Sequence, residues 1–289
     1  VFVNAGTELG QISSLSGVLT PGLIISFVLL GVFPLIAKWL VDRVKANRVY
    51  RGFTKPQVFD CDIVVIGAGS GGLVASLIAA TVKAKVTLIE RNKMGGDCLN
   101  TGCVPSKALI RSARLRFDNA SGEDLGFSNL DLDVDFKKIM ARVQRIIREI
   151  EPHDSVERYQ GLGVDVEIGH GEIISPWEVK VNGKVLTTRN IIIATGAEPF
   201  VPPIKDIEQV DYLTSDNLWQ LETLPEHTVV LGGGPIGTEL TQALARLGSR
   251  VTQVELLPRI LPREDEEFSA MVQTQLEIEG VNVLVDHRA

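Results

Sequence analysis

Two glycine-rich turns, each set between an apolar strand and a helix, constrain the fold of this chain more than any other feature. In the first, the apolar run 62–66 leads into Gly-Ala-Gly-Ser-Gly-Gly, a helix-like segment follows, and a second strand ends at Glu90. In the second, the run 228–231 leads into Gly-Gly-Gly-Pro-Ile-Gly, and the next strand ends at Glu255. A strand, a helix and a strand in this order form a unit with parallel strands. The pattern therefore predicts an α/β fold that contains two such units.

The three glycines of each turn have different roles in a dinucleotide-binding unit. The first permits a tight turn, the second lets a pyrophosphate approach the helix N-terminus, and the third allows the helix to pack closely on the strand. The acid that ends the second strand can accept hydrogen bonds from a ribose, and at Glu255 it would repel a 2′-phosphate, which favours NADH over NADPH. The predicted cofactor-binding residues are Gly67, Gly69, Gly72 and Glu90 in the first unit, and Gly232, Gly234, Gly237 and Glu255 in the second.

A cysteine pair lies directly after the first unit, in the segment GGDCLNTGCVPSK. Cys98 and Cys103 are five positions apart, and on an ideal helix that rise of about 7.5 Å is too long for a disulfide, so a bridge needs a distorted turn. Gly102 makes such a turn feasible. The dipole of the helix that follows is expected to lower the pKa of Cys103. A zinc site would need four ligands, and no second Cys or His cluster is present, so we expect no metal.

The motif G-G-x-C-x-x-x-x-C-x-P-S-K resembles the active-site signature of the class I pyridine nucleotide-disulfide oxidoreductases, and the resemblance runs from about residue 58 to the end of the chain. It implies FAD in the first unit, NAD(H) in the second, and a redox-active Cys98–Cys103 disulfide. Carried over to this sequence, Cys103 faces the flavin, Cys98 attacks the substrate, and Lys107 lies beside the flavin ring and pairs with Glu239. Further FAD contacts implied by the resemblance are Gly96, Lys107, Gly171, Ala194, Thr195 and Gly196. Asp97 departs from the pattern, because many members have Thr there.

The resemblance also implies an activity. Hydride would pass from NADH through FAD to the cysteine pair and on to a disulfide or a metal ion, as in the dihydrolipoamide dehydrogenase and mercuric reductase branches of the family, in a protein that is a homodimer at full length. One alternative is a membrane-attached flavoprotein NADH dehydrogenase without a thiol relay, against which the cysteine motif speaks. Another is a non-catalytic flavin-binding membrane protein, against which the intact glycine motifs and Lys107 speak.

The N-terminal segment holds a long uncharged run. No charged residue occurs from Leu19 to Ala37, which is about the length that a helix needs to cross a bilayer. Lys38, Arg43 and Lys45 follow it, so the positive-inside rule predicts a membrane protein whose catalytic part lies in the cytoplasm. The alternative is a buried core helix. The chain begins with Val and ends abruptly, so we expect a fragment, and its N-terminal stretch resembles the last helix of the SNARE-associated Golgi protein membrane family.

The predicted organisation follows from these features. We expect an extramembrane segment (1–17), a transmembrane helix (18–41), a basic linker (42–57), an FAD-binding domain with the redox-active disulfide (58–200) and the first part of a truncated NAD-binding domain (201–289). Within these domains we expect an amphipathic helix at 135–150, short strands at 163–193 with a hairpin turn at Asn182-Gly183, and a further helix at 263–279. A net charge of −7 argues against nucleic acid as a general partner.

Overall fold

The computed structural model describes residues 21–120, 122, 126 and 133–288, and the chain divides into two units, 1–57 and 58–289. Helix α2 (Pro21–Val49) is the helix of the first unit. Residues 21–37 of the uncharged run are thus helical, as predicted, but the helix continues past residue 41, so the first part of the predicted linker 42–57 is helix. The reason is local: residues 38–49 contain neither Gly nor Pro, and charged residues such as Lys and Arg are good helix formers.

The predicted membrane crossing has no support in this structure. Among the helices of the described ranges, none is long and apolar enough to cross a membrane. Residues 1–20, which include the predicted extramembrane segment and the first residues of the predicted span, lie outside the described residues. The resemblance of this stretch to a membrane family stays a prediction.

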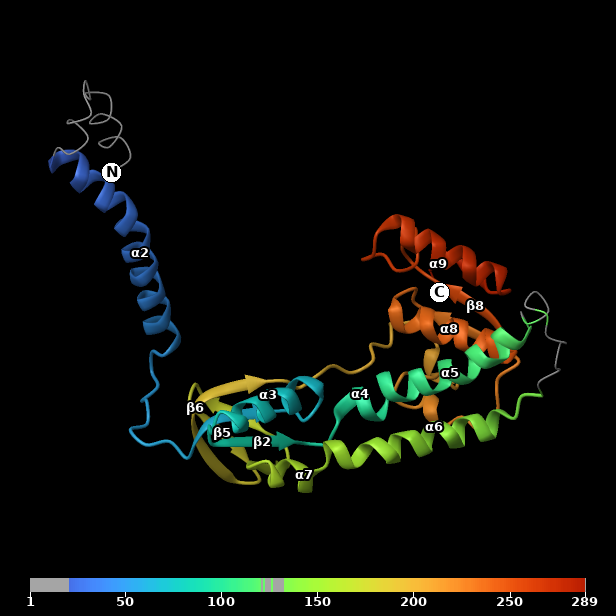
Figure 1. Cartoon of the computed structure of the whole chain (residues 1–289), viewed down its shortest axis with the longest axis horizontal. Helices are drawn as coiled ribbons and strands as arrows, with labels where there is room; N and C mark the ends of the chain where they lie inside the picture. The colour runs from blue at the N-terminus through green and yellow to red at the C-terminus, as the bar shows by residue number, and fades with distance from the viewer. Residues whose placement is uncertain (1–20, 121, 123–125, 127–132, 289) are drawn as a thin grey trace. The chain divides into compact units, whose positions relative to one another are not determined.

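The second unit begins with a six-stranded mixed sheet in the order β3-β2-β1-β6-β5-β4 (Figure 1). Strand β1 lies at its centre and pairs in parallel with β2 and β6, while β5 and β4 extend the sheet in antiparallel fashion. The parallel half is the arrangement predicted from the first glycine turn, because α3 returns the chain from β1 to β2. The bounds are β1 Cys61–Ile66, α3 Ser70–Thr81, β2 Val86–Glu90, β3 Val164–Ile168, β4 Glu172–Ser175, β5 Glu178–Val181 and β6 Lys184–Ile193.

The hairpin predicted for this sheet is confirmed. The turn between β5 and β6 has φ of 50° at Asn182 and 80° at Gly183, which is the left-handed pair that a type I′ hairpin requires. The third cysteine of the chain, Cys61, begins β1 and is 3% exposed.

Three long helices form a separate layer with its own core (Figure 1). Helix α5 contacts both α6 and α8, and buried side chains from all three belong to one hydrophobic cluster that also contains Trp219. The predicted amphipathic helix is α6: Asp135 caps its N-terminus by accepting from the backbone N–H of Lys138 at 3.0 Å, and Phe136 is among its buried residues. The bounds are α4 Gly96–Asn100, α5 Cys103–Ala120, α6 Phe136–Ile150, η3 Glu151–Asp154, α7 Val156–Gly161, η4 Ile207–Gln209 and η5 Leu218–Gln220.

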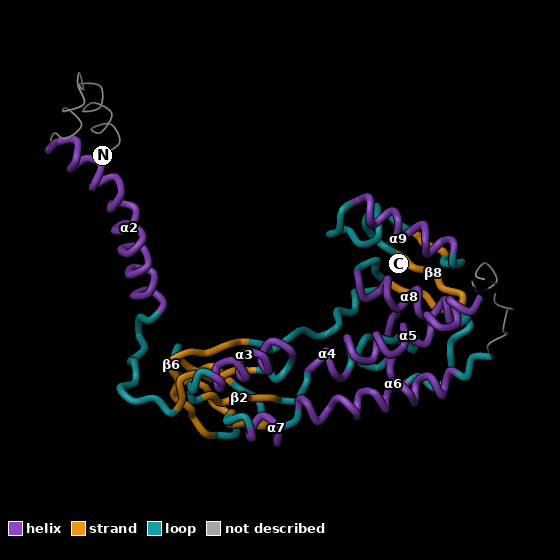
Figure 2. The backbone as a smooth tube through the Cα atoms, in the orientation of Figure 1, coloured by secondary structure: helices purple, strands orange, loops and turns teal. Residues whose placement is uncertain are grey.

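The second glycine turn belongs to a three-stranded parallel sheet in the order β7-β8-β9. Figure 2 shows its strands and those of the first sheet as two groups. The predicted helix at 263–279 is present as α9, and its acidic N-terminal turn suits the helix dipole. Both sheets thus contain the parallel pairing of a Rossmann-like fold. The bounds are β7 His227–Leu231, α8 Pro235–Leu247, β8 Arg250–Val254, α9 Glu266–Ile278 and β9 Asn282–Leu284.

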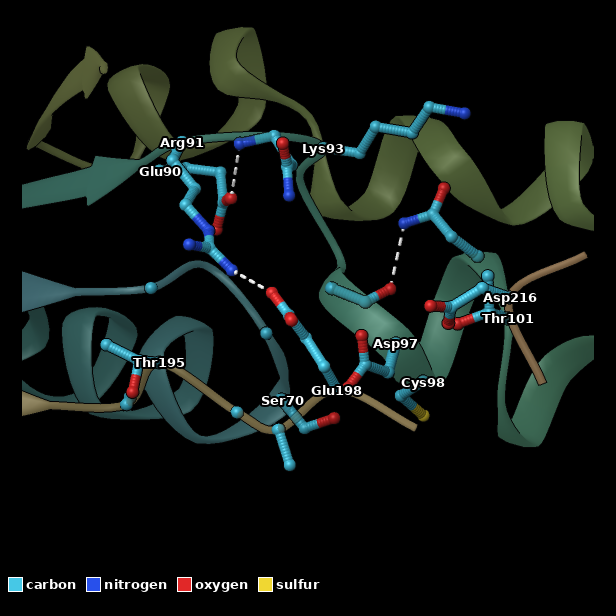
Figure 3. A pocket seen from close by; sticks show the side chains of 18 of the residues that line it. Ser70, Glu90, Arg91, Lys93, Asp97, Cys98, Thr101, Thr195, Glu198 and Asp216 are labelled. Atoms are coloured by element: carbon cyan, nitrogen blue, oxygen red, sulfur yellow. Dashed lines mark hydrogen bonds and ion pairs between the residues drawn. The ribbon is translucent and has the colours of Figure 1, made fainter. Parts of the chain in front are cut away.

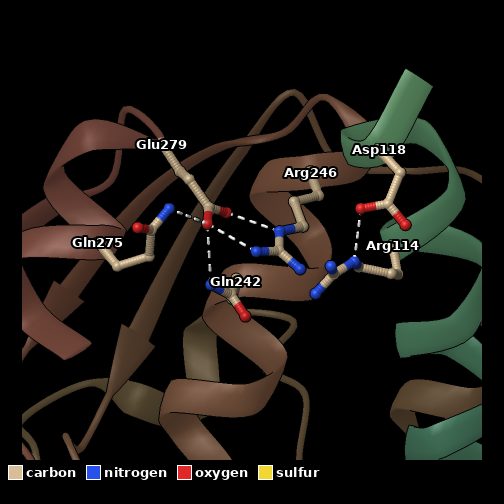
Figure 4. Close-up of polar contacts among 6 residues, drawn as sticks. All are labelled: Arg114, Asp118, Gln242, Arg246, Gln275 and Glu279. Carbon is tan, nitrogen blue, oxygen red and sulfur yellow. Dashed lines mark hydrogen bonds and ion pairs between the residues drawn. The ribbon is translucent and has the colours of Figure 1, made fainter. Parts of the chain in front are cut away.

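A buried ion pair fixes α9 on α8. Arg246 donates to both carboxylate oxygens of Glu279, at 2.7 and 2.6 Å, and the two side chains are only 10% and 4% exposed. Gln242 and Gln275 donate to the same carboxylate (Figure 4). The guanidinium of Arg246 also lies 4.2 Å from the centre of the Phe117 ring on α5. This arginine therefore joins three helices.

Candidate active site

In the first glycine turn, two of the three glycines are required by contacts within the protein itself. Gly67 has a φ of 104°, and a Cβ there would lie 2.2 Å from the carbonyl oxygen of Ala194; a Cβ at Gly72 would lie 1.8 Å from the carbonyl oxygen of Gly67. Gly69 is different. Its backbone is extended, and a Cβ there would come no nearer than 3.8 Å to any atom outside its chain neighbours. The space that Gly69 leaves is therefore available to a ligand.

The second glycine turn repeats this arrangement. Gly232 has a φ of 108°, and a Cβ at Gly237 would lie 2.3 Å from the carbonyl oxygen of Gly232. Gly234 has extended backbone and nothing within 4 Å of a Cβ built on it. In both turns the middle glycine is the N-cap of the following helix, and no side chain caps that helix. Each turn thus leaves helix N–H groups free to bind an anion.

The acids that end β2 and follow β8, Glu90 and Glu255, make equivalent hydrogen bonds. Glu90 accepts from the backbone N–H groups of Ala68 at 2.6 Å and Asn92 at 2.7 Å. Glu255 accepts from those of Gly233 at 2.6 Å and Leu257 at 2.8 Å. Both side chains belong to buried residues. Each carboxylate is therefore held against its own glycine turn, where the sequence predicts a ribose.

A cavity of about 1550 Å³ lies at the carboxyl ends of the central strands of the first sheet. Figure 3 shows Glu90, Thr195, Asp97 and Cys98 around it. This is the edge of a parallel sheet at which nucleotides bind in α/β folds. The residues predicted for the first cofactor site that line it are Gly67, Gly69, Glu90, Gly96, Gly171, Ala194, Thr195 and Gly196. Gly72 and Lys107 do not line it.

Several of these residues hold the cavity together. A Cβ at Gly96 would lie 2.6 Å from the Cα of Gly69, so the redox segment packs directly on the glycine turn. Ala194 donates its N–H to the carbonyl of Ile66 at 2.8 Å, which continues the β1–β6 pairing into the cavity wall. Gly171 packs against side chains of β1 and β2. A Cβ at this position would lie 3.3 Å from a methyl carbon of Ile66. The cavity is therefore assembled from several separate segments of the chain.

The two cysteines lie side by side as free thiols. Cys98 is half-buried on α4, and Cys103 is exposed at the first residue of α5. Gly102 permits their approach, because a Cβ there would lie 2.8 Å from the carbonyl oxygen of Asp97 and 3.4 Å from the Cα of Cys98. The distorted turn predicted between the cysteines is thus present. Cys98 lines the large cavity, whereas Cys103 lines a second, smaller one.

The pKa of Cys103 is raised above its ordinary value, which corrects the prediction that the helix dipole lowers it. The largest cause is the hydrogen bond with the Cys98 thiol, and burial adds to it. The positive charge of Lys107 acts in the opposite direction but does not prevail. The prediction considered the helix alone and left out the neighbouring thiol.

The predicted contact between Lys107 and Glu239 is present. The Lys107 ammonium lies 2.7 and 2.6 Å from the two carboxylate oxygens of Glu239. Lys107 is on α5, one turn after Cys103, and Glu239 is on α8, in the first turns after the second glycine turn. The pair therefore connects the redox segment with the second nucleotide unit.

Two contacts of the site are not among the predictions made from the sequence. The indole N–H of Trp219 donates to the carbonyl of Thr101 at 2.8 Å, which anchors the turn between the cysteines to η5. Across the cavity, Arg91 donates to Glu198 at 2.7 Å (Figure 3). Both contacts join residues more than a hundred positions apart. A tryptophan in a short polar segment was the only visible sign of the first.

The first cavity fits FAD in its size and in its chemistry. It exceeds the 300–1,000 Å³ typical of small-molecule sites, as an extended dinucleotide requires. Its wall combines an open glycine, uncapped helix N–H groups and an acid placed for a ribose. In the second unit, Gly234 and Glu255 offer the same features to a second dinucleotide.

Comparison with known proteins finds similar enzymes of two kinds, dihydrolipoyl dehydrogenases and mercuric reductases. A dihydrolipoyl dehydrogenase of Acholeplasma laidlawii is 35% identical over 228 residues, which is 77% of this chain and 68% of that protein. A mercuric reductase of Bacillus cereus is 32% identical over 226 residues, 78% of this chain and 36% of that protein. Over these relatives the chain thus spans from about a third to two thirds of their length.

The fold is also that of solved flavoproteins. The HOCl-induced flavoprotein disulfide reductase RclA from Escherichia coli, solved as its Cu(II) complex, superimposes with a TM-score of 0.67 at 29% identity, over 78% of this chain and 49% of that one. The sequence pattern of one family, Pyridine nucleotide-disulphide oxidoreductase, matches residues 61–289. This span holds both glycine turns, both acids, the cysteine pair and the Lys107–Glu239 contact, and the chain belongs to the pyridine nucleotide-disulphide oxidoreductase family.

Proposed function

We propose that this chain is the nucleotide-binding part of an NADH-dependent disulfide oxidoreductase in which Cys98 and Cys103 are the redox pair. The observation that carries the proposal is the position of that pair. The two thiols are in hydrogen-bond contact, and Cys98 lines the cavity formed by the first glycine turn. A disulfide formed between them would lie beside whatever occupies that cavity.

The family to which the chain belongs uses FAD and NAD(P)H. FAD, when bound, supplies the two-electron chemistry that connects a nicotinamide with a disulfide. The residues of this chain would bind and orient the two cofactors and connect their sites. The first turn and Glu90 would hold FAD, and the second turn and Glu255 would hold the nicotinamide dinucleotide. Lys107, held by Glu239, places a positive charge between the two dinucleotide-binding units, next to Cys103.

The preference for NADH rests on Glu255. Its carboxylate is fixed against the second glycine turn by two backbone N–H groups. A charge fixed there would repel a 2′-phosphate and leaves room for hydrogen bonds to free ribose hydroxyls. We therefore propose NADH as the reductant.

The substrate class is a disulfide, with a metal ion as the second candidate. The names of the relatives support both, since a dihydrolipoyl dehydrogenase and a mercuric reductase are similar to this chain to nearly the same degree. The homodimer expected from the family resemblance and the cytoplasmic location of the catalytic part both stay predictions.

The test is a count of thiols. The FAD-loaded protein, oxidised so that the pair is a disulfide, is treated with NADH under argon and then labelled with a maleimide, and the labelled peptides are identified by mass spectrometry. We expect two new thiols per chain, at Cys98 and Cys103. In Cys98→Ser or Cys103→Ser no new thiol should form. Cys61→Ala is the matched control, because Cys61 is buried in β1 and should not change the count.

The dehydrogenase alternative predicts another result. If NADH is consumed in the presence of a quinone while no thiol forms at either position, the chain transfers electrons without a thiol relay. If the protein binds no FAD at all, the proposed function is wrong.

A further inference from the structure

Trp219 reaches the turn between the two cysteines from a distant part of the chain. It lies in η5, in the segment that connects the two sheets, and its side chain is buried. Its indole N–H donates to the carbonyl of Thr101 at 2.8 Å and is shared with the carbonyl of Ser215 at 2.7 Å. Thr101 lies between Cys98 and Cys103. A residue 118 positions away from Thr101 therefore binds the backbone of the redox turn itself.

The rest of Trp219 is held by the layer of long helices. Gln144 on α6 donates its side-chain amide to the backbone carbonyl of Trp219 at 3.0 Å. The tryptophan also belongs to the hydrophobic cluster of that layer, with Leu109 of α5, Val143 of α6 and Leu247 of α8 among its members. A tryptophan has only two χ angles, so packing of its ring leaves the N–H little freedom. The indole N–H is therefore held at a fixed position beside the redox turn.

The consequence for the cysteines follows from where each of them lies. Cys103 begins α5, which packs against α6 and α8, whereas Cys98 lies on α4, a helix of only five residues. Thr101 follows α4 and donates its N–H back to the carbonyl of Asp97 at 2.9 Å. Figure 3 shows Thr101 and Cys98 beside the first cavity. The bond from Trp219 thus connects the short helix of one cysteine with the helical core that holds the other.

We propose that Trp219 is a positioning residue for the redox pair, and that its bond to Thr101 sets how readily the two thiols form a disulfide. The inference rests on the proposed function, in which Cys98 and Cys103 are that pair. Two thiols that the protein already holds together lose less freedom when the bond between them forms. Without the bond from Trp219, α4 can move away from α5. The disulfide then becomes less stable relative to the two thiols, and the reduction potential of the pair rises.

The test measures the equilibrium between the dithiol and the disulfide. The FAD-loaded protein is used, because Trp219 and Thr101 both line the first cavity. It is equilibrated under argon in glutathione buffers, in which two electrons and two protons pass from the cysteine pair to glutathione disulfide and give two molecules of glutathione. Free thiols are then blocked with a maleimide. Mass spectrometry gives the fraction of chains that contain the Cys98–Cys103 disulfide.

Trp219→Phe is the variant that removes the bond. It keeps an aromatic ring in the core but has no indole N–H, so the carbonyl of Thr101 loses its donor. We expect the equilibrium constant for disulfide formation to fall by about threefold to tenfold, the effect of losing one hydrogen bond. The reduction potential should accordingly rise by about 15 to 30 mV. An unchanged constant overturns the proposal.

Two control variants separate the bond from the packing. Trp177→Phe makes the same change at another buried tryptophan, between β4 and β5 of the first sheet, and should leave the potential unchanged. Val143→Ala removes two methyl groups from the cluster that contains Trp219, without removing the donor. It should lower the free energy of unfolding but not change the potential. If Val143→Ala raises the potential as much as Trp219→Phe does, core packing sets the potential and the role of the bond is wrong.

A second measurement needs no change at position 219. If the bond favours the disulfide, the disulfide must strengthen the bond by the same factor. We therefore expect the indole N–H of Trp219 to exchange with solvent about threefold to tenfold more slowly in the disulfide form than in the dithiol form, by the same hydrogen-bond argument. Nuclear magnetic resonance measures the exchange, and Trp39→Phe and Trp177→Phe identify the other two indole signals. Equal exchange rates in the two forms contradict the proposal.

The two proposals fail in different ways. If no disulfide forms between Cys98 and Cys103 in any buffer, the proposed function is wrong and the role of Trp219 falls with it. If the disulfide forms, but its potential is the same with Trp219 and with Phe at that position, only the role of Trp219 is wrong.

Discussion

Lys107 on α5 and Glu239 on α8 form an ion pair in which both carboxylate oxygens accept from the same ammonium, at 2.7 and 2.6 Å. The side chains are 58% and 42% exposed. An exposed pair adds only about 0–1 kcal/mol to stability. The contact is therefore better explained by where it places a charge, between Cys103 and the second nucleotide unit, than by what it contributes to folding.

The first prediction follows from this pair. We expect Glu239→Gln to change the free energy of unfolding by less than about 1 kcal/mol, while the rate of NADH-dependent thiol formation falls by about tenfold or more, a barrier increase of about 1.4 kcal/mol. Stopped-flow measurement of NADH consumption and a denaturant titration give the two values. Asp118→Asn is the control, since it breaks an ion pair of similar exposure on the same helix, away from the cysteines. A loss of stability that matches the loss of rate would contradict this prediction.

The second prediction concerns Gly69. Its backbone is one that alanine adopts easily, and its built Cβ meets nothing closer than 3.8 Å. Gly69→Ala should therefore leave the fold intact or stabilise it by about 0.4–1 kcal/mol. The Kd for FAD should nevertheless rise by about tenfold or more, a loss of about 1.4 kcal/mol, because the methyl group occupies space that the pyrophosphate needs. Flavin fluorescence titration measures the Kd, and Gly161→Ala, with nothing within 4 Å, is the control. An unchanged Kd would place the pyrophosphate elsewhere.

The third prediction distinguishes the cofactor bound near Glu255 from the one bound near Glu90. Glu255→Gln removes the fixed charge of the second unit, so the ratio of kcat/KM for NADPH to that for NADH should rise by about tenfold. The variant should also lose about 1–3 kcal/mol of stability, because glutamine has only one acceptor oxygen and its NH2 group would face the second backbone N–H donor. Glu90→Gln makes the equivalent change in the first unit, and we expect it to lower FAD content while leaving the nicotinamide preference alone. If Glu90→Gln shifts that preference instead, the two cofactors have been assigned to the wrong units.

How far the sequence predicts this molecule depends on the range of the interactions involved. The strand, turn, helix and acid of each unit are local patterns, and both units are found where the patterns place them. The Lys107–Glu239 contact joins residues 132 positions apart, and no local pattern indicates it; it came from the family resemblance. The family resemblance does not imply the hydrogen bond from Trp219 to the carbonyl of Thr101. This bond depends on how η5 packs on the redox turn, which sequence patterns do not encode.

Two predictions failed for identifiable physical reasons. Hydropathy locates the uncharged run in α2, but it does not locate the end of the helix, because residues 38–49 include charged side chains that favour helix as well as apolar ones do. The dipole argument for Cys103 treated the helix as the only influence on the thiol. Its pKa is instead governed first by Cys98, whose distance depends on the backbone at Gly102.

The last prediction concerns pH and the buried pair of Arg246 and Glu279. Burial would raise the pKa of Glu279, but hydrogen bonds from Arg246, Gln275 and Gln242 outweigh it and hold the pKa below the ordinary value of 4.5. A group whose pKa is lower in the folded state contributes stability above its unfolded pKa and loses it as the pH falls through the folded value. The free energy of unfolding should therefore decrease as the pH is taken below 4.5.

The substitutions divide the charge effect from the packing effect. Glu279→Gln should flatten this pH dependence, because position 279 can then no longer gain a proton in acid. Arg246→Met should cost about 3–5 kcal/mol at neutral pH, as removal of one partner from a buried pair does, and the folded state should then take up a proton at Glu279 at a higher pH than before. Urea titrations from pH 3 to 7 give these values, with the exposed pair of Arg145 and Glu149 as the control site.

Arg246 also contacts Phe117 on α5. We therefore expect Arg246→Met to loosen α5 and to speed alkylation of Cys103. If that rate does not change, this arginine supports α9 alone.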